Sequence, residues 1–84
     1  MPVLSRFYGI IIRMYFQQSE HNPPHFHAIY GEHTASIDIQ TGDVLEGELP
    51  KKALEMVIEW TEMHKSELLK MWETQEFTAL PPLE

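Results

Sequence analysis

The residues best suited to chemistry in this 84-residue chain are three histidines, His21, His25 and His27, which fall within seven positions of one another. Two prolines precede His25 and stiffen the backbone of the segment that connects it to His21. If His25 and His27 lie on one strand, their rings point to the same face, about 6.6 Å apart along the chain. Two imidazoles so placed can hold one metal ion or one phosphate, or act as acid and base near pH 7.

Three alternatives follow for this histidine segment. In the first, the rings hydrogen-bond loop carbonyls or contact a partner and have no catalytic role. In the second, His25 or His27 acts as a general base without a metal. In the third, His21 folds back and joins His25 and His27 as ligands of a divalent transition metal, with Glu20 nearby as a carboxylate. No cofactor is favoured among these alternatives.

A single cation, Arg13, interrupts the apolar segment near the start of the chain. A charge in a buried segment needs a partner, and Asp38 is a candidate, with Glu20 and Glu46 as others. Arg13 can instead be exposed with a buried stem. In the functional interpretation, Arg13 and a histidine together hold a phosphate or carboxylate. The further candidate binding residues are His21, Asn22 and Asp38.

The elements that must position these residues are a small sheet and one helix. The pattern predicts strands over residues 5–16, 25–30, 33–39 and 44–49, with Gly31 at the first position of the turn between the second and third. A helix is expected over residues 50–76, followed by an extended tail over residues 77–84. The predicted fold is therefore a single α+β domain over residues 1–84, in which a four-stranded, mostly antiparallel meander (residues 5–49) packs one face against a long C-terminal helix.

The helix is predicted from one apolar stripe at spacings of three and four residues. The stripe consists of Ala53, Val57, Trp60, His64, Leu68 and Met71. A serine at position 66 can cap a new helical start, so a bend or restart is expected near Lys65-Ser66.

Composition and charge narrow the classes of function. The chain has 43% hydrophobic residues, no cysteine and a net charge of −7, most of it in the helical half. It has no basic stripe, so direct nucleic-acid binding is disfavoured. The longest apolar run is about six residues, too short for a membrane span, and no secretory leader is recognisable. A cytoplasmic protein that binds a protein partner or a second copy of itself is expected.

Three segments of the sequence are similar to those of a known family. They are residues 2–15 (PVLSRFYGIIIRMY), residues 21–28 (HNPPHFHA) and the Glu59-Trp60 pair. On these segments the chain resembles a small bacterial family catalogued as domain of unknown function 4160. The resemblance implies a bacterial cytoplasmic protein, often encoded beside a second small family, in a pairing of the toxin–antitoxin kind. It implies no activity, cofactor or catalytic residue.

The sequence is therefore compatible with two functions. The first is a protein-interaction module, as one component of a toxin–antitoxin-like pair. The second is a small hydrolase or phosphodiesterase, with or without metal, in which His25 or His27 is the base and Arg13 stabilises developing negative charge.

Overall fold

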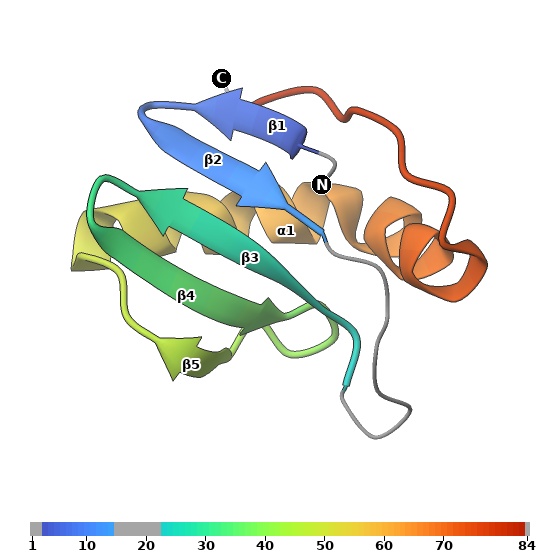
Figure 1. Ribbon diagram of the computed structural model, residues 1–84, viewed down its shortest axis with the longest axis horizontal. Coiled ribbons are helices and arrows are strands. Elements are labelled where there is room, and N and C mark those ends of the chain that lie inside the picture. The colour runs from blue at the N-terminus through green and yellow to red at the C-terminus, as the bar shows by residue number, and fades with distance from the viewer. Residues whose placement is uncertain (1–2, 15–22, 84) are drawn as a thin grey trace.

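The computed structural model describes residues 3–14 and 23–83 and consists of an antiparallel sheet followed by one helix. The elements are β1 (Val3–Phe7), β2 (Ile10–Arg13), β3 (His25–Tyr30), β4 (His33–Asp38), β5 (Val44–Gly47) and α1 (Lys51–Thr74). Each strand pairs with the next one along the chain, so the order in the sheet is β1-β2-β3-β4-β5. The helix crosses one face of this sheet (Figure 1). The α+β class and the C-terminal helix are confirmed, whereas the predicted number of four strands is wrong.

The additional strand arises because a tight turn divides the segment that was predicted as one strand over residues 5–16. Tyr8 and Gly9 both have positive φ, 49° and 81°. Two consecutive residues in that region form the turn whose twist matches a two-residue β-hairpin. Phe7 and Ile10 pair directly across the turn, and both are buried. The apolar run therefore continues through the hairpin, which is why the pattern alone suggested a single strand.

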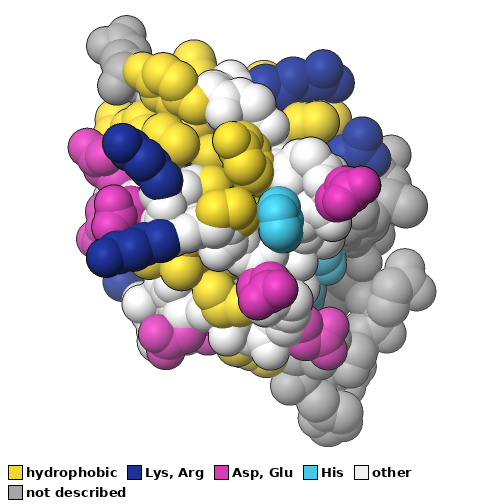
Figure 2. Space-filling model, turned by 90° about the vertical axis from the view of Figure 1, so that its left-hand side faces the viewer, with side chains coloured by type: hydrophobic (Ala, Val, Ile, Leu, Met, Phe, Trp, Pro, Cys, Tyr) yellow, Lys and Arg dark blue, Asp and Glu magenta, His cyan; other side chains and the backbone are white. Residues whose placement is uncertain are grey.

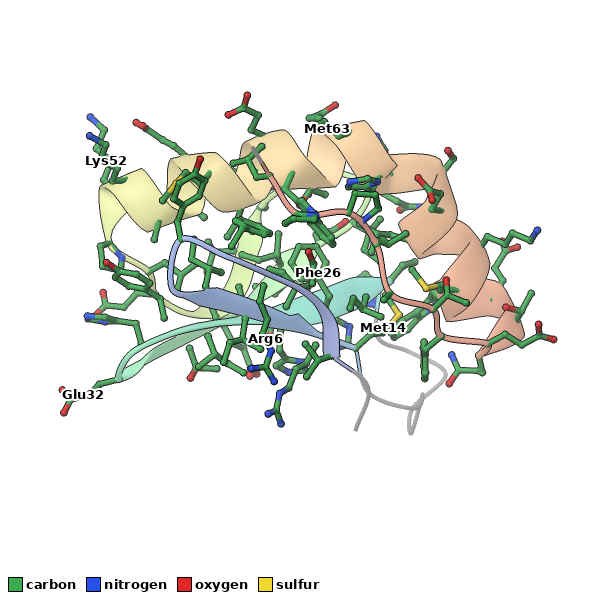
Figure 3. The ribbon with its side chains drawn as sticks, turned by 90° about the horizontal axis from the view of Figure 1, so that it is seen from above. Arg6, Met14, Phe26, Glu32, Lys52 and Met63 are labelled. Atoms are coloured by element: carbon green, nitrogen blue, oxygen red, sulfur yellow. The ribbon has the colours of Figure 1, made fainter. Side chains whose placement is uncertain are left out.

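The hydrophobic core lies between the sheet and α1. Figure 3 shows Phe26 pointing from the sheet toward the helix, while Arg6 points away on the other side. Trp60 of α1 is fully buried, with its ring centroid 5.7 Å from that of Phe7 and 5.8 Å from that of Phe26. Every residue of the predicted apolar stripe is buried, which confirms that interpretation.

The helix begins and bends close to the predicted positions. Pro50 has an extended backbone, with φ −55° and ψ 147°, so it precedes the helix and Lys51 is the first helical residue. His64 has non-helical angles, with φ −121° and ψ 18°, and it marks a kink one residue before the expected bend. In the described part of the chain, α1 is not apolar enough to cross a membrane.

The two edges of the sheet differ. Beside β1, the backbone N–H of Leu80 donates to the carbonyl of Leu4 at 2.7 Å, and the segment after α1 runs along this edge (Figure 1). The indole N–H of Trp60 donates to the Pro81 carbonyl at 2.9 Å and holds the same segment on the core. At the opposite edge, all four residues of β5 are exposed, and no described segment pairs with its outer side. The sheet thus has one covered edge and one open edge.

Candidate functional site

A row of polar side chains crosses the sheet face that points away from α1, which we call the open face. Arg13 on β2 is paired with His27 on β3, His27 with Ser36 on β4, and Ser36 with Glu46 on β5. Directly paired residues of antiparallel strands project from the same face of the sheet. The four side chains therefore stand side by side, although they come from segments that are far apart in the sequence.

A depression of about 240 Å³ lies over part of this row. We call it the histidine pocket, and its lining residues are Pro23, His25, His27, Ser36, Leu45 and Glu46. His25 and His27 are half-buried, and their ring centroids are 5.4 Å apart in an edge-to-face arrangement. The predicted pair of imidazoles on one strand face is therefore present, and Phe26 between them points into the core.

The ring of His25 is fixed on two sides. Its Nδ1 donates a hydrogen bond to the carbonyl of Pro23 at 2.9 Å, because a carbonyl can only accept. Its ring also packs against Trp72 of α1, with centroids 5.1 Å apart. With the proton on Nδ1, the neutral ring presents Nε2 as a hydrogen-bond acceptor, and the same form can act as a base. Pro23 therefore sets the tautomer that a ligand meets.

The environment of His27 favours the neutral imidazole. Burial lowers the pKa of His27 from its ordinary value of 6.5, the neighbouring His25 lowers it further, and the Glu46 carboxylate opposes the shift in part. Arg13 faces the same ring from β2. Near neutral pH, the pocket therefore holds one carboxylate and an uncharged His27.

This lowered pKa predicts a pH dependence of stability. Between the lowered pKa and 6.5, the unfolded chain binds more protons at position 27 than the folded chain. The contribution of His27 to the free energy of unfolding is therefore complete above pH 6.5 and is lost as the pH falls toward the lowered value. Urea unfolding of the wild type between pH 5 and pH 8 should show this loss, which His27→Gln should remove.

The control for this prediction is His33→Gln, because His33 is exposed at the β3–β4 turn. The control variant should keep the pH dependence of the wild type. If the stability of the wild type and that of His27→Gln change in parallel with pH, His27 has the same pKa in the folded and the unfolded chain.

Arg13 is half-buried beside His27, and its Nε atom is buried. Within the described ranges, its Nε–H donates no hydrogen bond and the guanidinium makes no ion pair. The candidate partner Asp38 lies opposite His25 instead. Its Oδ1 accepts the backbone N–H groups of Gln40 at 2.7 Å and Thr41 at 3.1 Å, so this carboxylate shapes the turn after β4. Arg13 and His27 are brought together, whereas Asp38 is engaged elsewhere.

The metal hypothesis depends on residues that the structure does not cover. Glu20, the other candidate carboxylate, and His21 and Asn22 lie outside the described residues. Among residues 3–14 and 23–83, no three His, Asp or Glu side chains are grouped in a way that could hold a metal ion. A site formed by His21, His25 and His27 stays a prediction.

Sequence reasoning did not select Ser36 as a site residue and treated Glu46 only as an alternative partner for Arg13. Ser36 had one visible signal, because it is a polar residue between the apolar residues Ala35 and Ile37. Glu46 had none, since its place beside Ser36 depends on how β5 is aligned with β4. That alignment includes an irregularity between Ser36 and Ile37, which cannot be predicted from the sequence.

The architecture is that of a two-layer α+β protein, with a five-stranded antiparallel meander, one helix on one face and a polar pocket on the other. A family described as a domain of unknown function (DUF4160) matches residues 9–73. Because the match spans most of the chain, the protein belongs to this family. The matched range includes the whole histidine pocket and ends before the segment that covers β1.

Comparison with curated proteins and comparison with solved structures each gave no match. The family itself is described by its unknown function. The geometry of the open face is therefore the basis for a function.

Proposed function

We propose that the protein is a protein-interaction module that binds its partner on the open face and takes a basic side chain of that partner into the histidine pocket. The observation that carries this proposal is the excess of hydrogen-bond acceptors in the pocket. Glu46 supplies a carboxylate, Ser36 a hydroxyl oxygen, and His25 an Nε2 acceptor in the tautomer set by Pro23.

A guanidinium or ammonium group complements such a pocket. It carries only donors, and its positive charge is attracted by the Glu46 carboxylate. The ring of His25, which packs against Trp72, lines one end of the pocket and offers a flat guanidinium a surface on which to stack. An anionic group would instead be repelled by the Glu46 carboxylate.

The open edge of the sheet supports a protein as the partner. Val44 and Leu45 are exposed apolar residues on β5, and Leu45 also lines the pocket. An extended segment that pairs with a free strand gains backbone hydrogen bonds, while neighbouring pockets select its side chains. The net charge of −7 favours a basic protein surface over a nucleic acid.

The resemblance described above suggests a source for this partner. In such gene pairs, the partner would be the product of the adjacent gene, and the two proteins would form a complex of the toxin–antitoxin kind. The pocket and the open edge are the features of this chain that would mediate the complex.

Calorimetric titration of the purified chain with the product of the adjacent gene tests this function. We expect the wild type to bind and Glu46→Arg to bind at least about tenfold more weakly, because the reversed charge repels the basic side chain of the partner. The matched control is Glu59→Arg, which makes the same change of charge at an exposed position of α1. This control should bind like the wild type.

Equal binding by both variants would place the interface elsewhere than at the pocket. A wild-type chain that ignores the neighbouring product and stays monomeric would argue strongly against the interaction module.

A second candidate function, hydrolysis of a phosphodiester, is favoured by one observation. His25 has its Nδ1 proton held by Pro23 and its Nε2 available as a base, and Arg13 lies on the same face beside His27. A base and a cation so arranged suit attack on a phosphodiester, in which negative charge develops.

Expression of the chain in a bacterial host tests this alternative through growth arrest and RNA cleavage. His25→Ala should abolish either effect, with a loss of about 100-fold or more in cleavage rate. His33→Ala is the control, and it should behave like the wild type. Cleavage that survives His25→Ala would remove His25 from the mechanism.

A further inference from the structure

The charges on the open face are separated into two sides. Arg6 on β1 and Arg13 on β2 lie toward one edge, and Glu46 on β5 lies toward the other. On the right-hand side of Figure 2, Lys and Arg side chains lie above Asp and Glu side chains. The face is therefore basic at one end and acidic at the other.

Arg13 and Glu46 are too far apart to pair within one chain. They are separated by three steps between neighbouring strands, which is about 14 Å at a strand spacing of about 4.8 Å. Arg13 makes no ion pair in the part of the chain that the structure describes. Within residues 3–14 and 23–83, neither group therefore has an ion-pair partner, and each can attract an opposite charge from a second molecule.

We propose that the partner of this face is a second copy of the same chain, and that each Arg13 enters the histidine pocket of the other copy and pairs with its Glu46. This inference rests on the proposed function, because it names the basic side chain that the pocket takes. The two copies would be related by a two-fold axis that runs parallel to the strands, above the line between β3 and β4. Such an axis exchanges the basic and acidic ends, so both ion pairs form together.

The geometry of stacked sheets is compatible with this arrangement. Two sheets packed face to face lie about 10 Å apart, a gap that an arginine and a glutamate extended toward each other can span. Ile11 and Ile29 are paired with each other on the open face and are only half-buried. Ile29 on β3 lies next to the axis and Ile11 on β2 lies one strand further out, and the second copy would cover both.

The size of the face indicates a weak dimer. Five strands of four to six residues present roughly 300–400 Å² of flat surface, about half of what each partner contributes to a standard interface. We therefore expect a weak dimer that is visible only in concentrated solution.

Sedimentation equilibrium at 10 μM to 1 mM tests the proposal with charge-reversal variants. Arg13→Glu alone and Glu46→Arg alone should each weaken self-association at least about tenfold, because each creates two like-charged contacts per dimer. An equimolar mixture of the two variants should associate as tightly as the wild type, within about threefold, because both contacts again join opposite charges. The controls are Lys70→Glu and Glu59→Arg on the exposed side of α1, which should leave self-association unchanged.

The circular dichroism spectrum of each variant verifies that it is folded before the measurement. A wild type that is monomeric at 1 mM overturns the proposal, and so does a mixture that associates no better than the separate variants. If the wild type does not self-associate but binds the neighbouring product through Glu46, the dimer fails and the proposed function stands. If the wild type neither self-associates nor binds the neighbouring product, the dimer and the proposed function both fail.

Discussion

Replacement of Trp60 by alanine is expected to lower the free energy of unfolding by about 3–5 kcal/mol. The side chain is fully buried at the centre of α1 and packs between Phe7 and Phe26 of the sheet and His64 of its own helix. Its removal leaves a cavity between the two layers and releases the hydrogen bond to Pro81. A domain of this size has roughly 4–13 kcal/mol of stability in total, so Trp60→Ala should lose a large part of it.

Urea unfolding followed by circular dichroism measures this loss. Trp60→Phe keeps an aromatic ring in the core but has no N–H for Pro81, and it should cost less than Trp60→Ala. Met63→Ala is the control on the same helix, because Met63 is 58% exposed, and it should change the stability by no more than about 0.5 kcal/mol. A loss below about 1 kcal/mol for Trp60→Ala would mean that the core does not depend on this ring.

Replacement of Gly47 by alanine is expected to cost about 2–4 kcal/mol and to displace β5. Gly47 has φ +75°, and a Cβ atom at this position would overlap the backbone carbonyl oxygen of Thr34 on β4. Because that oxygen belongs to the backbone, the overlap is relieved only if the two strands separate. Leu45 and Glu46 are on β5, so the same change should also disrupt the histidine pocket.

Gly42→Ala is a matched control for this prediction. Gly42 has a similar φ of +79°, but no atom lies within 4 Å of an added Cβ, so only backbone strain of about 1 kcal/mol is expected. The difference between the two variants in urea unfolding isolates the effect of the overlap. Equal losses of stability in the two variants would show that the displacement of β5 costs no additional free energy.

The parts of the fold that were predictable from the sequence depend on short-range patterns. β3 has the predicted bounds, and the turn after it contains Gly31 with φ +60°, as expected. The buried stripe and the bend of α1 follow from spacings within a single helix. In each case, the physical cause lies within about ten residues of the feature, so one segment of sequence contains the information.

Two features could not be predicted from the pattern of apolar and polar residues. They are the hairpin at Tyr8 and the set of residues that form the candidate site. Tyrosine seldom adopts positive φ, so Tyr8 did not indicate a turn. Ser36 and Glu46 join the histidines only through the alignment of β3, β4 and β5, which is a long-range property of the sheet. Asp38 was selected for its charge, whereas the structure uses its carboxylate to bind two backbone N–H groups.

The difference between the two edges of the sheet also bears on uncontrolled polymerisation. Growth of a cross-β fibril requires each chain to offer a free strand on both sides, so that every added chain creates the next docking position. Here the side of β1 is occupied through Leu80, and among the strands that the structure describes β5 is the one left free. Edge-to-edge addition would therefore end after two chains, which protects a chain with exposed Val44 and Leu45 from forming open-ended fibres.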